Sequence, residues 1–340
     1  MAIVGGFDVH RAQITFDYVD LETGEVSTGR IGPADRDALA AWLRRFAGQT
    51  QVAFAVEGCT GWRYVVEELE RAGMEAHLAE PADTAALRGP KRRAKTDKAD
   101  ARHLRQLLMD GRLPESWLAP PHVLEVRALG RLYIDLLDER RSWQQRIRAQ
   151  LYHQGVPAQR LLFGPEGRKE LALAALSPAG SQSVATGLSM IDALTDQLDP
   201  LRAQLGEFAR RQVGCRALTG LYGVGPLTGP IVWAEMGDCR RFSSSRQAVR
   251  HTGLDVTVYS SDGKRTRGHL ARQGPPALRW ALFEAAQSAA RSSSPDHDYY
   301  LAVRDRLGAN RACLSIARKL ARRAHHILRN LGDDAWADVA

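Results

Sequence analysis

The order of apolar runs in the first 80 residues constrains the fold more than any other feature of this 340-residue chain. Three short runs of strand-like composition follow one another, separated by turn residues, at residues 3–9, 14–19 and 26–31. A segment with apolar residues at helical spacing comes next, between Asp35 and Gly48. A buried strand at residues 52–56, a helix through Ala72 and a last strand near residues 76–78 complete the pattern.

Three strands, a helix, a strand, a helix and a strand make the order of a ribonuclease H-like α/β fold. Asp8 lies on the first of these strands and Glu57 ends the fourth. Asp97 and Asp100 lie three residues apart, which on a helix puts both carboxylates on one face. Because unpaired buried carboxylates are costly, a hard cation such as Mg²⁺ or Mn²⁺ is their natural partner. Taken singly, each acid could instead be a turn or helix-entry residue.

Positive charge surrounds Asp97 and Asp100. Lys and Arg exceed Asp and Glu by 47 to 39 over the whole chain, for a formal net charge of +8. Such an excess favours a polyanionic partner, most simply nucleic acid, whose phosphodiester two carboxylate-held ions could clamp. A solvated helix start with mixed charges is the alternative. The residues expected to contact nucleic acid in this stretch are Arg92, Arg93, Lys95, Lys98 and Arg102.

Cysteine usage and hydropathy bear on the compartment. The four cysteines lie far apart without a C-x-x-C pair, which predicts neither a disulfide framework nor a cysteine zinc site. The chain has no run of 18 apolar residues, and its N-terminus lacks a signal-peptide pattern. We therefore expect a soluble, cytoplasmic protein that does not engage a membrane.

The middle of the chain reads as a helical spacer. Long amphipathic helices are predicted at about residues 123–154 and 183–213, with a short helix at 169–176 and a break at 177–180. We interpret the two long helices as an antiparallel coiled coil that also dimerises. The apolar residues of the first helix are Leu124, Leu129, Leu132, Leu136, Ile147 and Leu151. The second helix carries an apolar stripe of Leu188, Ile191, Leu194, Leu198, Leu201 and Leu205. The predicted domains are residues 1–115, 116–214 and 215–340.

The C-terminal part is predicted to be mainly α-helical, with two segments suited to phosphate. Leu218–Gly229 resembles a helix-hairpin-helix, whose glycines, Gly223 and Gly225, allow a tight turn that presents N–H groups to phosphate oxygens. A connection without a ligand is the alternative. Residues 253–265 read as a polar loop in which a hydroxyl beside positive charge could attack a phosphate. The basic residues that follow the hydroxyls are Lys264, Arg265 and Arg267.

Three short motifs resemble the D-E-D-D signature of the insertion sequence family 110 transposases, a group that includes the Piv-type DNA invertases. They are Gly6-Phe7-Asp8-Val9-His10, Val56-Glu57-Gly58-Cys59-Thr60-Gly61 and Lys95-Thr96-Asp97-Lys98-Ala99-Asp100-Ala101-Arg102. The resemblance implies a RuvC-like N-terminal domain in which Asp8, Glu57, Asp97 and Asp100 hold Mg²⁺ and are catalytic. It also implies a coiled coil between two domains.

The family pattern continues with tyrosine, one residue and serine ahead of a basic run. Counted from Tyr259, this resemblance makes Ser261 the nucleophile. The chain departs from the pattern at Val256, where the family has proline, and at Asp262, where it has glycine. Because a glycine stands one position later, a one-residue slip would make Ser260 the nucleophile instead.

The resemblance implies a DNA recombinase that mobilises an insertion sequence through a covalent serine–DNA intermediate. It implies a structured guide (bridge) RNA, and we expect a homo-oligomer, a dimer or tetramer, in which one subunit's acids meet another's serine. Two alternatives stay open. One is a two-metal hydrolytic nuclease such as a RuvC-like junction resolvase, and the other is a non-catalytic nucleic-acid-binding scaffold.

Overall fold

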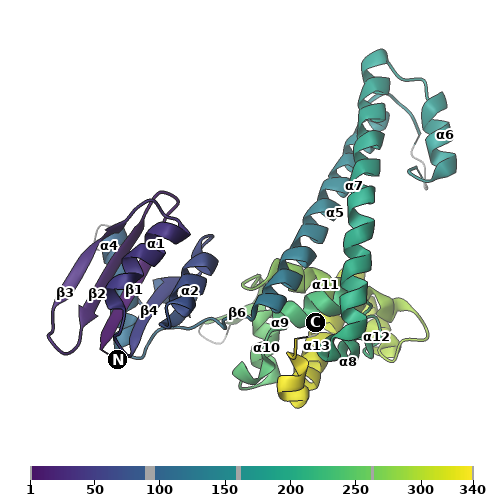
Figure 1. The fold of residues 1–340 in the computed structure, drawn as a ribbon. Helices are drawn as coiled ribbons and strands as arrows, with labels where there is room; N and C mark the ends of the chain where they lie inside the picture. Colours follow the sequence, from purple (N-terminus) through teal and green to yellow (C-terminus); the bar gives the residue numbers. More distant parts are fainter. Residues whose placement is uncertain (1, 89–95, 158–161, 262–263, 339–340) are drawn as a thin grey trace. The chain divides into compact units, whose positions relative to one another are not determined.

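The computed structural model describes residues 2–88, 96–157, 162–261 and 264–338, and from 258 to 267 it describes the backbone alone. Two compact units make up the chain, Met1–Leu118 and Ala119–Ala340 (Figure 1). The first is a mixed α/β unit built on a five-stranded sheet, and the second is mainly helical.

The sheet of the first unit has the strand order β3-β2-β1-β4-β5. The first three strands form an antiparallel meander, and β4 and β5 run parallel to β1. All five strands were predicted, and their observed bounds agree with the predicted ones to within one or two residues. Their bounds are β1 (Ile3–Val9), β2 (Ile14–Asp20), β3 (Val26–Ile31), β4 (Val52–Glu57) and β5 (Glu75–Ala79).

Helices cover both faces of this sheet. Asp35 caps α1 by accepting a hydrogen bond from the Ala38 amide, which explains where the predicted helix begins. The N-terminal helices are α1 (Arg36–Leu43), α2 (Trp62–Arg71), α3 (Pro81–Ala86) and α4 (Asp97–Met109), with a 3-10 turn, η1 (Arg44–Phe46).

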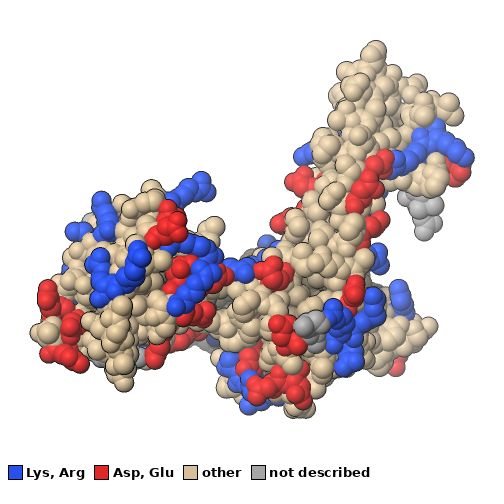
Figure 2. All heavy atoms as spheres, in the orientation of Figure 1, with Lys and Arg blue, Asp and Glu red and all other residues tan. Residues whose placement is uncertain are grey.

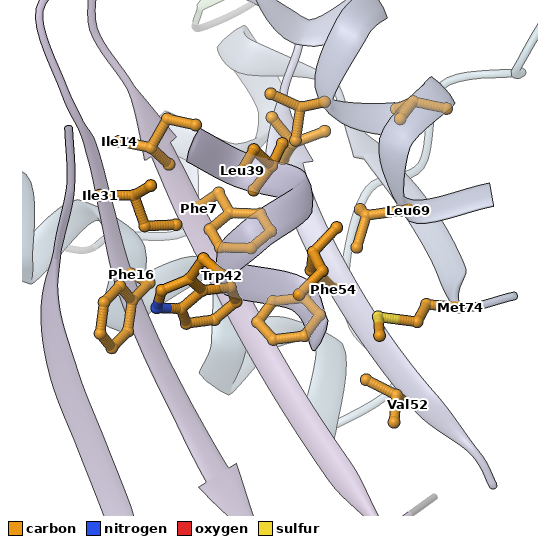
Figure 3. Close-up of a cluster of buried hydrophobic side chains, with 14 of the residues drawn as sticks. Phe7, Ile14, Phe16, Ile31, Leu39, Trp42, Val52, Phe54, Leu69 and Met74 are labelled. Atoms are coloured by element: carbon orange, nitrogen blue, oxygen red, sulfur yellow. The ribbon is translucent and has the colours of Figure 1, made fainter. Parts of the chain in front are cut away.

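The main apolar core lies between the sheet and helices α1 and α2 (Figure 3). Phe7 stacks on Phe54 of the neighbouring strand with ring centroids 4.5 Å apart, and Trp42 of α1 meets both rings. Successive strand residues point to opposite faces. The residues that alternate with these, Val4 and Ala55 among them, therefore pack on the other face, against α4.

Helix α4 lies unusually close to β1 because of Gly6. A Cβ added at Gly6 would lie 2.8 Å from the Arg105 amide nitrogen and 2.9 Å from the Leu104 Cβ. Only glycine leaves room for the helix backbone at this point. The close approach brings the start of α4 to the end of β1, where Asp8 lies.

Two long helices extend from the second unit, α5 (Pro121–His153) and α7 (Pro178–Arg211). They run antiparallel, because Gly187 of α7 packs on Ile147 of α5 while Gly180 packs on Gln154. The predicted break lies slightly earlier than expected, at residues 174–177, between α6 and α7. Ser177 caps α7, and Pro178 occupies its first turn, where proline needs no amide donor.

The first half of α5 buries other residues more deeply than the leucines that the sequence analysis named, of which Leu124, Leu129 and Leu136 are partly buried. The residues buried there are Val123, Val126, Gly130, Tyr133 and Leu137, whereas Leu132 is exposed. Leucine content misled the prediction, since tyrosine and glycine occupy core positions. The predicted short helix begins earlier than expected, as α6 (Pro165–Leu173).

The remaining helices form a compact bundle around α9, every residue of which is buried. Their bounds are α8 (Val213–Thr219), α9 (Thr228–Met236), α10 (Ser245–His251), α11 (Pro276–Gln287), α12 (His297–Leu307) and α13 (Ala309–Leu331). Short 3-10 turns are η2 (Cys239–Arg241), η3 (Ser288–Ala290) and η4 (Gly332–Ala335). Among the helices described, none is long and apolar enough to cross a bilayer.

The polar loop predicted at residues 253–265 is instead part of a β-hairpin, β6 (Val256–Ser261) and β7 (Lys264–Leu270). A local sequence pattern predicts this hairpin. Two β-branched valines alternate along Val256-Thr257-Val258, and an Asp-Gly pair follows the strand, which is a strong hairpin pattern.

Candidate metal centre and nucleic-acid contacts

The ends of β1 and β4 bring two of the predicted acids together. Phe7 pairs with Val56 in parallel register, so that Asp8 and Glu57 follow at the same edge of adjacent strands. Phe7 and Val56 both point into the α1–α2 core. Asp8 and Glu57 are the next residues along and project to the opposite face, the one covered by α4.

The first turn of α4 supplies the other two acids. Thr96 caps the helix through its hydroxyl, which accepts from the Ala99 amide, and Asp97 and Asp100 lie in that first turn. An N-terminal turn favours carboxylates because its amide groups carry partial positive charge. Gly6, two residues before Asp8, seats this helix against β1. The strand acids and the helix acids therefore share one face of the sheet.

Three donor atoms converge at this point. The Asp8 Oδ2 lies 3.2 Å from the His10 Nε2, and the same nitrogen lies 3.5 Å from the Asp97 Oδ1. These three ligand atoms all lie within 4.8 Å of one another. The Gln13 amide donates to the other Asp97 oxygen at 3.4 Å. A single cation with bonds of about 2.1 Å spans about 4.2 Å between opposite ligands, so this spacing suits one ion.

The electrostatics of Asp8 favour a cation there. Burial is the main cause that raises the pKa of its carboxyl, and the negative charges of Asp100 and Asp97 add to it, while His10 lowers it. Thr15, paired directly with Asp8 on β2, is fully buried, and its Oγ1 has no hydrogen-bond partner among the described residues. A buried orphan oxygen beside clustered carboxylates fits a site for a hard divalent ion.

Asp100 and Glu57 stand somewhat apart from the three converging donors. Asp100 is buried and forms an ion pair with Arg88, yet it lies close enough to raise the pKa of Asp8. Glu57 and Asp8 both contribute to raising the pKa of the Cys59 thiol, after burial, which is the first cause. Among the described residues, the group that could hold one ion contains neither Asp100 nor Glu57.

His10 is the residue that the sequence prediction missed. It stood in the quoted motif but received no role. The signal was its spacing: His10 comes directly after the end of β1, two positions beyond Asp8. Side chains two apart along an extended segment project to the same side, so the imidazole of an Asp-x-His pair can accompany its carboxylate.

The predicted nucleic-acid contacts of this unit fall into two groups. Arg92, Arg93 and Lys95 lie outside the described residues. Lys98 is exposed, and Arg102 lies 3.5 Å from Asp17 through its Nε. On the face in view, Lys and Arg side chains of this unit are interleaved with Asp and Glu rather than gathered into one patch (Figure 2).

The helix-hairpin-helix resemblance corresponds to α8, α9 and the turn between them. Gly223 has a φ of 91°, and a Cβ there would collide with Ala285 and Ser288 of the neighbouring segment. Glycine is therefore required by the turn and by its packing. The Gly225 amide donates to the Thr228 hydroxyl at 3.0 Å, within the turn itself.

Ser261 ends β6 and is paired across the hairpin with Lys264, while Ser260 is paired with Arg265. Arg267 lies further along β7, opposite Val258. Asp8, Glu57, Asp97 and Asp100 belong to the first unit and both serines to the second.

Comparison with known proteins gives matches over most of the chain. A family model of DEDD-type transposases of the IS110 group matches residues 5–154, and the model of the Transposase IS116/IS110/IS902 family matches residues 215–301. A "Probable family 20 transposase" from Pseudomonas aeruginosa is 24% identical over 282 residues, 79% of this chain and 81% of the relative. The "Transposase for insertion sequence element IS1111A" from Coxiella burnetii is 30% identical over 138 residues, 39% of this chain and 37% of the relative.

An α/β unit with clustered carboxylates, matched by a transposase model, defines the class as an enzyme that acts on DNA. The chain belongs to the IS116/IS110/IS902 family of transposases. Membership in the DEDD group also indicates the use of a divalent metal ion, and the donors around Asp8 are of the kind such an ion binds.

Proposed function

We propose that this transposase mobilises an insertion sequence by cutting and rejoining DNA through a covalent serine–DNA intermediate. The observation that carries the proposal is the convergence of Asp8 and Asp97 from different elements onto one point, with Asp100 close by. In the proposed RuvC-like domain, Asp8, Glu57, Asp97 and Asp100 hold Mg²⁺ or Mn²⁺. When bound, the metal polarises the scissile phosphate and stabilises charge on the leaving oxygen.

Ser261 is the proposed nucleophile. Its Oγ gives up its proton to solvent and attacks phosphorus, an Oγ–P bond forms, and the P–O3′ bond breaks, so that the 3′ oxygen leaves as a hydroxyl after taking a proton from solvent in exchange. One phosphodiester replaces another, and the reverse attack by a 3′ hydroxyl can rejoin DNA without another energy source. Lys264 pairs with Ser261 across the hairpin, which places a cationic residue beside the attacking strand position.

The proposed assembly follows from where these residues lie in the chain. Because the acids belong to one unit and Ser261 to the other, we propose a dimer or tetramer in which one subunit's acids meet another's serine. The antiparallel α5–α7 pair, in the proposed spacer at 116–214, is the candidate dimerisation element. A structured guide RNA is part of the proposal, and the net charge of +8 suits a protein that holds RNA as well as DNA.

One experiment separates this function from its two alternatives. The full chain is incubated with Mg²⁺ and DNA spanning the ends of the element, with and without RNA transcribed from the element. Products are resolved on a denaturing gel. We expect a protein–DNA adduct that Ser261→Ala abolishes and Ser260→Ala retains. Asp97→Asn should lower the rate of cutting by at least about 100-fold, as expected for loss of one electrostatic stabiliser.

Each alternative has its own outcome. Free cut ends without an adduct in the wild type would identify a hydrolytic nuclease, in which water replaces the serine. If Asp97→Asn leaves both Mg²⁺ binding and DNA turnover unchanged, the acids are structural and the chain is a nucleic-acid-binding scaffold. An adduct lost in Ser260→Ala but kept in Ser261→Ala would move the nucleophile by one residue.

A further inference from the structure

The imidazole of His10 faces both Asp8 and Asp97 through the same ring nitrogen. Its Nε2 lies 3.2 Å from the Asp8 Oδ2 and 3.5 Å from the Asp97 Oδ1. One acid comes from strand β1 and the other from helix α4, so a single ring nitrogen faces carboxylates from two elements. These separations match the distance of about 3 Å between adjacent ligands of an ion with bonds near 2.1 Å.

A second histidine of the same unit shows what an ordinary imidazole–carboxylate arrangement looks like. His77 on β5 also meets two acids, but through different ring atoms: its Nδ1 lies 3.1 Å from Glu115 and its Nε2 lies 3.7 Å from Glu75. The two carboxylates therefore lie on opposite sides of the ring. Within the described part of the chain, the group of donors able to hold one ion includes His10 and not His77.

A purely structural role gives a weak account of His10. Its side chain is 54% exposed, and ion pairs at such exposure contribute little to stability. A metal ligand, by contrast, has reason to lie at the solvent edge of a site, with its nitrogen directed at the same point as two carboxylate oxygens. Neutral imidazole is the commonest protein ligand of first-row divalent ions.

We propose that His10 is a metal ligand and that its nitrogen makes this centre prefer Mn²⁺ to Mg²⁺. The inference rests on the proposed function, because it assumes that Asp8 and Asp97 bind a divalent ion. Mg²⁺ favours an all-oxygen shell, whereas affinity for nitrogen donors rises along the first-row series that begins with Mn²⁺. An Asp, Asp, His set therefore takes a divalent ion of borderline hardness, and His10 joins the four acids of the proposed metal-binding set.

The test uses electron paramagnetic resonance on the full chain loaded with Mn²⁺. Echo-envelope modulation detects nitrogen bonded to the ion, and labelling histidine with ¹⁵N assigns that nitrogen to imidazole. We expect a nitrogen coupling in the wild type and in His77→Asn, the matched control, and its loss in His10→Asn. The affinity for Mn²⁺ should fall about 10-fold or more in His10→Asn, at least the loss seen for outer-shell partners. The affinity for Mg²⁺ should change much less.

A rescue variant separates ligand loss from misfolding. His10→Asp restores a donor but makes it oxygen, so we expect Mg²⁺ binding to rise while the nitrogen coupling stays absent. Bound Mn²⁺ without a nitrogen coupling in the wild type, or a coupling that persists in His10→Asn, would overturn the inference and leave the acid site intact. If Asp8→Asn and Asp97→Asn do not weaken Mn²⁺ binding, the metal site of the proposed function fails instead.

Discussion

Two aspartates on neighbouring strands of the first unit meet the same helix in opposite ways. Asp17 on β2 is fully buried, and the Arg105 guanidinium of α4 donates to it at 2.5 Å. Asp8 on β1 is half-buried, and the start of the same helix presents Asp97 and Asp100 to it. Helix α4 thus places arginine side chains beside Asp17 and further carboxylates beside Asp8.

The difference separates an acid that is paired within the fold from one that we propose binds a metal ion. A buried carboxylate that is paired and hydrogen-bonded holds two elements together, and its loss leaves an uncompensated charge on the helix. A set of like charges costs free energy in the protein alone, a cost that a bound cation can offset. Asp17 therefore secures α4 against the sheet, and this placement makes the unfavourable grouping around Asp8 persist.

The largest effect on stability is expected at the paired acid. Asp17→Asn should lower the free energy of unfolding by about 3 to 5 kcal/mol, because Arg105 would be left buried without its partner. Denaturant titration of the full chain measures this change. Glu22→Gln, in the exposed turn after β2, is the control and should change stability by less than about 0.5 kcal/mol.

The double replacement Asp17→Leu with Arg105→Met sharpens this prediction. Because apolar side chains can substitute for a buried ion pair, the double variant should recover most of the lost stability. A loss no greater than that of Glu22→Gln in the single variant would show that Asp17 does not secure the helix.

An intermediate effect is expected at Gly6, which precedes Asp8 by two residues on β1 and is paired with Asp17 on β2. Gly6→Ala would push a methyl group into the α4 backbone, so we expect about 1 to 3 kcal/mol of destabilisation together with weaker Mn²⁺ binding, since Asp97 would move away from Asp8. Gly32→Ala, whose added Cβ would meet only the Ala12 oxygen at 3.8 Å, is the control. If Gly6→Ala is destabilised but binds Mn²⁺ as tightly as the wild type, the close approach of α4 to β1 is not needed to form the metal site.

The smallest expected effect on stability is a gain instead of a loss. Asp8→Asn should raise the Tm of the metal-free protein, because it removes a carboxylate whose charged form burial disfavours. The folded-state pKa of Asp8 is raised above 3.8, so the wild type binds a proton more tightly when folded and loses stability as pH rises through that pKa. The difference in Tm between Asp8→Asn and the wild type should therefore increase from low pH toward neutral pH.

Thermal melts of both proteins in a chelator across that pH range measure the difference in Tm. Melts with added Mn²⁺ measure how much the ion stabilises each protein. The ion should raise the Tm of the wild type but not that of Asp8→Asn, because binding stabilises only the form that holds the metal. A variant that melts below the wild type at every pH would mean that Asp8, like Asp17, is a structural acid.

Local patterning predicted most of the first unit. Period-two apolar runs and a capping aspartate placed all five strands and α1, because each signal acts within a few residues along the chain. Spacing and family resemblance also singled out Asp8 and Asp97, whose oxygens lie together in the structure, whereas the roles of all four predicted acids stay a prediction. The serine hairpin was missed although its signal was equally local, since Asp262 was weighed only as a departure from the family pattern.

The sequence by itself determined which residues bear charge and where strands and helices begin, because propensity, capping and alternation are short-range. Only the tertiary structure decided that Asp17 would be neutralised and Asp8 would not. Both are aspartates on half-polar strands, and their difference arises from the register of β1 against β2 and from the depth at which Gly6 seats α4. Such long-range packing fixes which turn of the helix faces each acid, and no spacing along the chain encodes it.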